Sequence, residues 1–172
     1  MNPLQRLIRG TRTWALLLVM TALLQPARSH AEPTPLPAGA VLASDPWNAV
    51  QIIRPAELAK LIAGPAADAP LLLHVGFKPL FRGGAIPGSR YVGPGRTAEG
   101  IASLKRAVKG LPNDRSIVLY CGCCPWDHCP NMRPAFKAMR QLGFTHVRAL
   151  YITKNLDTDW VDKGFPIETP KR

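Results

Sequence analysis

The chain has 172 residues and a formal net charge of +11. Its basic residues form no Lys/Arg run and do not alternate with aromatic residues as in RNA-reading proteins, so nucleic acid is not an expected partner. The sequence also contains no P-loop, no dinucleotide-binding glycine motif, no G-x-S-x-G nucleophile motif and no internal repeat, which excludes the enzyme classes that depend on them.

The first 31 residues have the pattern of a secretory signal peptide. Three arginines precede an apolar run from Trp14 to Leu24, and Ser29-His30-Ala31 offers a small-residue cleavage site. The run is shorter than the about 20 residues of a membrane-spanning helix. We therefore expect cleavage near Ala31, a periplasmic or secreted mature protein and no stable membrane insertion; an uncleaved anchor is the alternative. Cleavage lowers the net charge from +11 to +7, because the segment holds four arginines and no acid, and a basic protein attracts small anions.

Prolines at alternate positions indicate an extended segment after the cleavage site. We predict a Pro-rich tether and lead-in at residues 32–49, in which Trp47 packs on an edge of the domain that follows. The remaining length, residues 50–170, fits one domain.

Apolar runs alternate with amphipathic stretches through this domain. The predicted strands are residues 52–53, 71–75, 91–92, 116–120 and 147–152, and the predicted helices are residues 55–63, 98–109, 131–142 and 157–162. Glycines and prolines make residues 83–95 a loop around the third strand. The alternation predicts an α/β domain with a parallel sheet flanked by helices and right-handed crossovers.

All four cysteines lie in the stretch from Cys121 to Pro134, which reads CGCCPWDHCPNMRP. The stretch joins the strand at 116–120 to the helix at 131–142, so the sulfurs lie between the carboxyl end of a strand and a helix N-terminus. Ligands bind at this edge of open α/β sheets, and helix N-termini favour anions, thiolates included. The helix N-terminus and nearby Arg133 both lower a thiol pKa, so the thiols of this loop, Cys121 at the strand end among them, are candidate nucleophiles.

Several motifs resemble those of rhodanese-like (sulfurtransferase) domains, in the same order and spacing over residues 50–168. They are Ile86-Pro87-Gly88-Ser89, Tyr120-Cys121 at a strand end, Leu142-Gly143-Phe144, and Trp160 followed by Gly164-Phe165-Pro166-Ile167-Glu168. The resemblance implies a rhodanese-like fold without a cofactor, in which Cys121 takes a sulfane sulfur as a persulfide. The implied partners are a small sulfur-containing anion or persulfide donor and a thiol acceptor.

The sequence departs from the family pattern at two places near the expected site. Where much of the family has Asp-Val-Arg at a strand end, this chain has His74-Val75-Gly76. The loop from Cys121 to Gly143 is longer than the resemblance implies, and the additional residues include Trp126, His128 and Cys129.

Three alternatives stay open for Cys123, Cys124 and Cys129. In the first alternative, these cysteines relay sulfur or electrons from Cys121, because persulfide transfer needs a second thiol or acceptor nearby. In the second alternative, Cys124 and Cys129 form a structural disulfide, as an oxidising compartment permits. In the third, the loop binds copper(I) or zinc. The metal ligands would then be Cys121, Cys123, Cys124, Cys129 and His128.

Other side chains near the loop have supporting roles in this hypothesis. We expect Trp126 to cover the sulfurs as a lid and His128 to act as a base or as a metal ligand. Arg133, Arg82 and Arg90 supply positive charge for an anionic substrate. His74, within an apolar strand, is predicted to be a hydrogen-bonded core histidine.

The sequence therefore predicts an extracytoplasmic rhodanese-like sulfurtransferase that moves sulfane sulfur through the 121–129 loop. A periplasmic module that binds or delivers copper or zinc through the same loop is one alternative. A non-catalytic rhodanese-fold module that docks a partner protein is another.

Overall fold

The structure is a computed structural model and describes residues 35–170. The predicted signal peptide lies outside these residues, and the boundaries of the tether at 32–49 and of the domain at 50–170 stay predictions. Within the described part of the chain, no helix has the length and apolar character that a bilayer crossing needs.

Strands and helices alternate along the described residues. The strands are β1 (Ile52–Ile53), β2 (Leu71–His74), β3 (Arg90–Tyr91), β4 (Ile117–Tyr120) and β5 (Val147–Leu150). The helices are α1 (Pro55–Ala63), α2 (Lys78–Gly83), α3 (Ala98–Ala107) and α4 (Met132–Gln141), with shorter helical turns η1 (Ala49–Gln51), η2 (Ala66–Asp68), η3 (Trp126–His128) and η4 (Asp157–Val161).

Local chemistry starts and ends the longer helices. Pro55 begins α1, where its missing N–H group would have no helical partner in any case. The Thr97 side chain caps α3 by accepting a hydrogen bond from the Gly100 amide at 3.0 Å. Gly143, at φ +86°, follows α4 in the left-handed conformation that glycine adopts without strain.

The five strands form one parallel sheet in the order β1-β5-β4-β2-β3. The central strand β4 pairs with β2 from Ile117 opposite Leu71 to Tyr120 opposite His74. Because all strands run the same way, their carboxyl ends meet at one edge of the sheet. This arrangement confirms the predicted α/β fold class and places the residues after β2 and β4 side by side.

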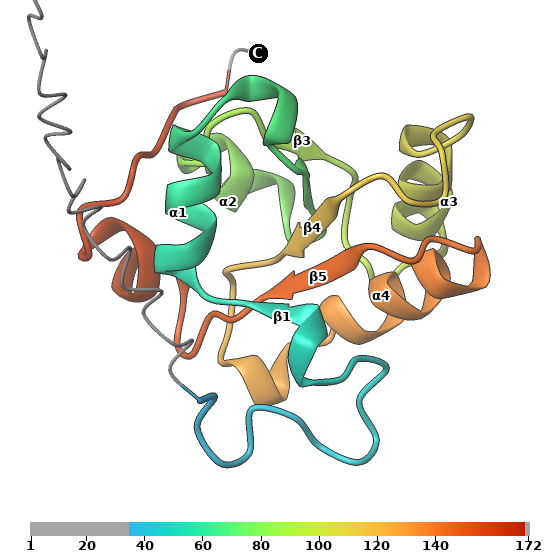
Figure 1. The fold of residues 1–172 in the computed structure, drawn as a ribbon, viewed down its shortest axis with the longest axis horizontal. Coiled ribbons are helices and arrows are strands. Elements are labelled where there is room, and N and C mark those ends of the chain that lie inside the picture. Colours follow the sequence, from blue (N-terminus) through green and yellow to red (C-terminus); the bar gives the residue numbers. More distant parts are fainter. Residues whose placement is uncertain (1–34, 171–172) are drawn as a thin grey trace, which may run out of the picture. The chain divides into compact units, whose positions relative to one another are not determined.

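Alternate residues of β4 face opposite layers of the domain. Ile117 and Leu119 belong to the apolar cluster that includes α3 and α4, whereas Val118 and Tyr120 belong to the cluster that includes α1 and η4. Figure 1 shows α3 and α4 on one side of the sheet and α1 on the other. The sheet is therefore buried on both faces, as its continuous apolar strands predict.

The structure differs from the sequence prediction at α2. No helix was predicted at this position, yet Lys78–Gly83 forms one whose buried Phe81 packs on the rings of His74 and Tyr91, at centroid distances of 5.3 and 5.6 Å. A helix of six residues that ends in Gly83-Gly84 has little intrinsic propensity. The tertiary contact of Phe81 stabilises it instead.

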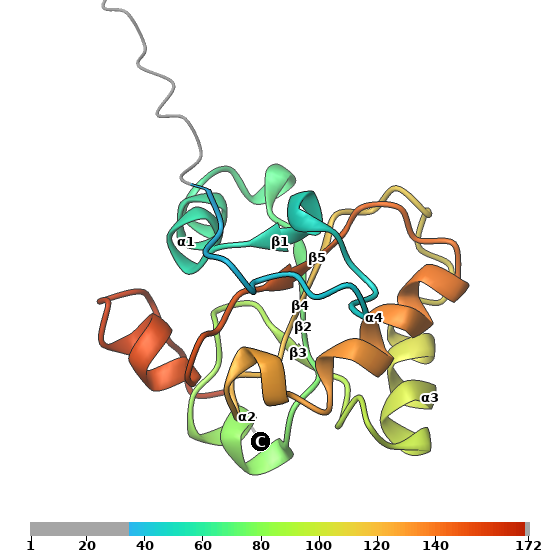
Figure 2. The same cartoon turned by 90° about the horizontal axis from the view of Figure 1, so that it is seen from below.

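The described part of the lead-in packs on the loop after β4 and on α4. Trp47 is buried, with its ring centroid 4.9 Å from that of Trp126 and 5.4 Å from that of Phe136. The Trp126 indole N–H donates to the Ala40 carbonyl at 2.9 Å. The lead-in (blue to cyan) runs along this side of the domain and reaches α4 in Figure 2. Trp47 thus covers an edge of the domain, as predicted.

This packing yields a prediction for stability. Trp47→Ala removes a buried aromatic ring from between Trp126 and Phe136, and we expect the free energy of unfolding to fall by about 3–5 kcal/mol. Urea unfolding followed by circular dichroism measures the change. Val50→Ala, at a side chain that is 82% exposed nearby, is the matched control and should stay within about 0.5 kcal/mol of the parent. Equal stabilities of the two variants would contradict the packing role.

Candidate functional site

The candidate site is the loop that connects β4 to α4. Cys121 directly follows β4, and Asn131 directly precedes α4. Between them, η3 begins after Pro125 and ends at Cys129. The loop therefore lies at the carboxyl edge of the sheet, as the sequence predicts.

Gly122 sets the direction of the chain after β4. Its φ of +70° is in the left-handed region, and a Cβ at this position would lie 2.8 Å from Cβ of Leu156. Glycine therefore satisfies both the backbone and the packing here. The turn brings Cys121 and Cys123 to the same side, with their sulfur atoms 2.9 Å apart.

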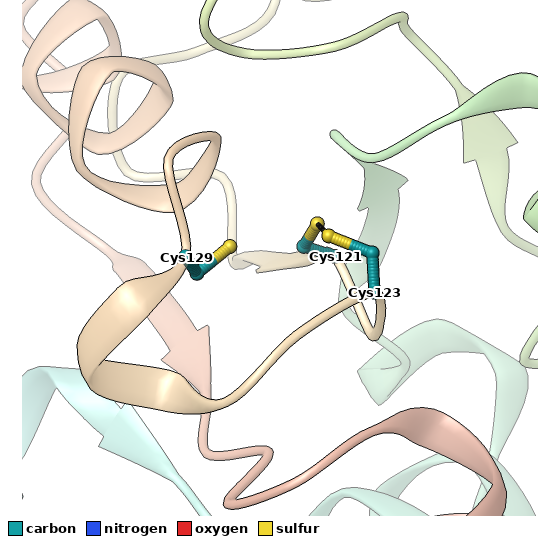
Figure 3. Close-up of side chains that lie close together, drawn as sticks. All are labelled: Cys121, Cys123 and Cys129. Carbon is teal, nitrogen blue, oxygen red and sulfur yellow. Dashed lines mark hydrogen bonds between the residues drawn. The ribbon is translucent and has the colours of Figure 1, made fainter.

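Three sulfurs form a compact cluster. The Sγ atoms of Cys121, Cys123 and Cys129 all lie within 4.8 Å of one another, and Figure 3 shows the Cys129 side chain directed toward the other two. Cys124 Sγ is 3.0 Å from Cys123 Sγ but is not a member of this cluster. All four cysteines are free in the structure, and the Cys124–Cys129 disulfide stays an alternative from the sequence.

Asn131 organises the cluster from the start of α4. It is fully buried, and its Nδ2 donates to Cys121 Sγ at 3.4 Å and to Cys123 Sγ at 3.8 Å. Its Oδ1 accepts from the Arg96 amide at 3.3 Å. Sequence analysis did not identify this residue, because an asparagine before a helix indicates an N-cap. Here the side chain makes no cap hydrogen bond and contacts sulfur instead.

Hydrogen bonds within the cluster divide the thiols into two kinds. Hydrogen bonds with Cys123 and Cys129, together with burial, raise the pKa of Cys121. Hydrogen bonds from Cys121 and Cys129 lower the pKa of Cys123. The cluster therefore concentrates negative charge on the half-buried Cys123, and the pKa of Cys121 is raised rather than lowered as the sequence suggested.

His74 closes the other side of Cys121 from the end of β2. The ring is buried against Phe81, Tyr91 and Tyr120, and Nδ1 accepts from the Gly76 amide at 3.3 Å. Burial lowers its pKa to about 4. His74 is therefore neutral near pH 7, and the prediction of a hydrogen-bonded core histidine is confirmed.

Gly76 allows the two strand ends to approach closely. A Cβ at Gly76 would lie 2.8 Å from His74 Cε1, 2.9 Å from the Cys121 carbonyl oxygen and 3.0 Å from Cys121 Sγ. The sequence departs from the family pattern at Gly76, and this departure was the signal from which the close contact could have been predicted. No larger side chain fits between β2 and Cys121 without displacement of the loop.

A cleft of about 380 Å³ leads to Cys121. Cys121 and Gly122 line it together with His74, with residues of α2, and with Leu156 and Asp157 at the start of η4. Cys121 is the cysteine that faces this cleft, whereas Cys123, Cys124 and Cys129 do not line it. Among the described residues that line the cleft, Asp157 is the one with a charged side chain.

The predicted arginines are not at this cleft. The Arg133 guanidinium donates to Asp45 Oδ1 at 2.8 Å and to the carbonyls of Trp126 and Asp127 at 3.4 and 3.2 Å, so its charge binds the lead-in. Arg82 and Arg90 are exposed and do not line the cleft.

Trp126 and His128 differ in their relation to the sulfurs. Trp126 is buried and, with Cys121, Cys124 and Cys129, lines a small internal void. His128 is exposed, pairs with Asp127 at 2.8 Å and does not belong to the sulfur cluster. The metal-ligand set suggested from the sequence therefore narrows to Cys121, Cys123 and Cys129.

Comparison with known proteins identifies the fold. No family model matches the chain, and no curated protein matches it. A solved structure of a Bacillus halodurans protein is similar, with a TM-score of 0.52 and 21% identity over 68% of this chain and 75% of that chain. A crystal structure of a protein from Anabaena sp. has a TM-score of 0.51 and 22% identity over 69% of this chain and 82% of that chain.

A solution structure described as the rhodanese-like domain of the same Anabaena protein is also similar. Its TM-score is 0.50, with 21% identity over 70% of this chain and 80% of that chain. At these identities the likeness concerns the fold. The chain has a rhodanese-like fold, and the expectation from the sequence motifs is confirmed.

The contact between Gly76 and Cys121 gives a second prediction. Gly76→Ala should destabilise the protein by about 1–3 kcal/mol, because the added methyl group must displace either His74 or Cys121. It should also change the rate at which iodoacetamide alkylates Cys121, read by peptide mass spectrometry.

Gly64→Ala is the matched control, because a Cβ at Gly64 would lie 3.4 Å from the Leu61 carbonyl oxygen, an ordinary contact, and Gly64 does not line the cleft. That variant should stay close to the parent in melting temperature and alkylation rate. If Gly76→Ala behaves as Gly64→Ala does, the contact between Gly76 and Cys121 has no structural importance.

Proposed function

We propose that this rhodanese-like protein is a sulfurtransferase in which Cys121 receives a sulfane sulfur from a donor in the cleft. The observation that carries the proposal is the position of Cys121, which directly follows the central strand β4 and lines the cleft. The fold likeness supports the same assignment, because the sequence motifs resemble those of sulfurtransferase domains.

The transfer consists of two thiol exchange steps. The Cys121 thiolate attacks the terminal sulfur of a donor R–S–SH; the new bond is Cys121 S–S, the donor S–S bond breaks, and R–S⁻ leaves. An acceptor thiolate then attacks the terminal sulfur of the Cys121 persulfide, which regenerates the Cys121 thiolate and forms the acceptor persulfide. The two steps transfer one sulfur with no net oxidation, so no external oxidant or reductant is needed.

Cys123 is placed to take the proton from Cys121. Its sulfur lies 2.9 Å from Cys121 Sγ, within hydrogen-bond distance, and Asn131 donates to both sulfurs. Because hydrogen bonds lower the pKa of Cys123 and raise that of Cys121, the form in which Cys123 holds the proton and Cys121 is the thiolate is the minor one, and Cys121 attacks from that form.

The charge around the cleft favours persulfide donors over sulfur oxyanions. Asp157 lines the cleft, whereas Arg133 is paired with Asp45, and Arg82 and Arg90 lie outside the lining. An anion with two negative charges meets no fixed positive charge among the described lining residues. In a low-molecular-weight persulfide such as that of glutathione, the persulfide end carries at most one negative charge and the carboxylates are several bonds away, so the end that enters the cleft is repelled less than a doubly charged sulfur oxyanion.

Replacement of the nucleophile gives the primary test. Cys121→Ser should lower kcat/KM for sulfur transfer from glutathione persulfide to a thiol acceptor by at least about 1,000-fold, because the persulfide has no other site in the cleft. Mass spectrometry should find the persulfide on Cys121 of the parent protein. Cys124→Ser, outside the cleft lining, is the control and should retain transfer. Unchanged turnover of Cys121→Ser would remove Cys121 from the mechanism.

The cleft charge gives a separate prediction about donor choice. Asp157→Asn should raise kcat/KM for thiosulfate by about 2- to 5-fold and leave that for glutathione persulfide nearly unchanged, because an exposed carboxylate repels an anion only modestly. Asp162→Asn is the matched control, since Asp162 is exposed on the same segment but does not line the cleft. The same increase in both variants would mean that the effect is one of net charge and not of the cleft.

A further inference from the structure

The thiol of Cys129 is not explained by sulfur transfer. The longer loop turns through η3 and returns this side chain toward Cys121 and Cys123, although Cys129 does not line the cleft (Figure 3). Cys129 is buried and, unlike Cys121, has no contact with the cleft, so a donor in the cleft does not reach it. The position of Cys129 therefore indicates that the cluster has a second role.

We propose that Cys121, Cys123 and Cys129 form a three-sulfur binding site for one copper(I) ion. The three Sγ atoms lie within 4.8 Å of one another, on a loop fixed at both ends by β4 and α4. Three sulfurs around one ion with metal–sulfur bonds of about 2.3 Å would be about 4 Å apart. The Cys121–Cys123 pair, at 2.9 Å, needs to open by about 1 Å, and half-buried Cys123 follows Gly122 in the loop.

The surroundings of Cys121 and Cys129 suit a soft ion. A void of about 10 Å³ beside these two residues and Cys124 is otherwise lined by Gly122 and by the apolar side chains of Trp126, Met132, Leu150 and Ile152. Half-buried Cys123 belongs to the cluster but does not line this void. Thiolate sulfur is the preferred ligand of copper(I).

Hydrogen-bond donors at the start of α4 balance the charge of the thiolates. Asn131 Nδ2 donates to Cys121 Sγ at 3.4 Å and to Cys123 Sγ at 3.8 Å. Three thiolates and one copper(I) ion leave two negative charges, which a helix N-terminus with oriented N–H groups stabilises. The same donors would hold the sulfurs in place around the ion.

The ligand number favours copper(I) over zinc. Structural zinc sites are almost always four-coordinate. The exposed His128 does not belong to the cluster, and Cys124 also lies outside it. Three soft sulfurs without a fourth ligand match the low coordination numbers that copper(I) accepts.

The test loads the reduced, full-length chain with copper(I) without oxygen and titrates it with the chelator bathocuproine disulfonate. The parent protein should retain one copper per chain. Cys121→Ser, Cys123→Ser and Cys129→Ser should each weaken retention by at least about 100-fold, because each removes one of three ligands. X-ray absorption should report about three sulfur neighbours of the copper.

Two matched controls separate this site from other ligand sets. Cys124→Ser and His128→Ala remove neighbouring metal-binding groups outside the cluster, so both should retain copper as the parent does. Loss of retention in either control, or an absence of retention in the parent, would overturn the three-sulfur site. Thermal melts of all five variants show whether a loss of copper reflects a loss of the fold, and X-ray absorption of the parent decides the ligand number without any variant.

The copper site and sulfur transfer share Cys121 and are therefore mutually exclusive, but their failures are distinguishable. Copper bound at one equivalent should abolish persulfide formation on Cys121. A protein that forms the Cys121 persulfide but retains no copper would keep the proposed function and lose this inference. A protein that retains copper while Cys121→Ser still transfers sulfur at the parent rate would do the reverse.

Discussion

The close approach of the ends of β2 and β4 is the constraint on which the site depends. The strands pair in register, and the Val75 amide donates to the Tyr120 carbonyl at 2.8 Å just before the chain reaches Gly76 and Cys121. A side chain at Gly76 would contact the Cys121 sulfur and carbonyl. Cys121 is therefore held between the ends of two buried strands, where the rigidity of the sheet fixes the sulfur relative to the cleft.

The positive charge of Arg133, which sequence analysis assigned to an anionic substrate, binds the lead-in instead. Arg133 pairs with Asp45, whose side chain is fully buried, and its guanidinium lies 5.4 Å from the Trp47 ring centroid. An ion pair of this kind orders the lead-in against the loop, and removal of either partner would leave an uncompensated charge. The net charge of the chain consequently gives no measure of the potential at the cleft, which Asp157 makes less favourable to anions.

The longer loop places additional thiols beside Cys121 in the rhodanese-like fold. Trp126 anchors η3 to Ala40 and to Trp47, and this anchor returns Cys129 to the cluster. One side of Cys121 then faces the cleft, and the other faces two additional thiols and the Asn131 amide. In the proposed mechanism, the nucleophile and the soft metal ligands share the sulfur of Cys121, so a metal ion bound to the cluster would block its reaction in the cleft.

The sequence by itself determined the fold class and the place of the cysteine loop. Periodicity of apolar residues is a local property, and it identified the buried strands, most of the helices and the strand end at Cys121. Adjacency in the chain also placed the sulfurs next to α4. The fold likeness to solved structures agrees with the motifs from Ile86 to Trp160.

Only the tertiary structure decided which groups meet. Arg133 contacts Asp45 from 88 positions away, and the Arg96 amide contacts Asn131 from 35 positions away. The choice of Cys129 over Cys124 as the third sulfur depends on the turn at η3, which the packing of Trp126 sets. The short helix α2 likewise forms because Phe81 is buried against β2 and β3. Such contacts are decided by the shape of the packed core, which no local pattern of residues encodes.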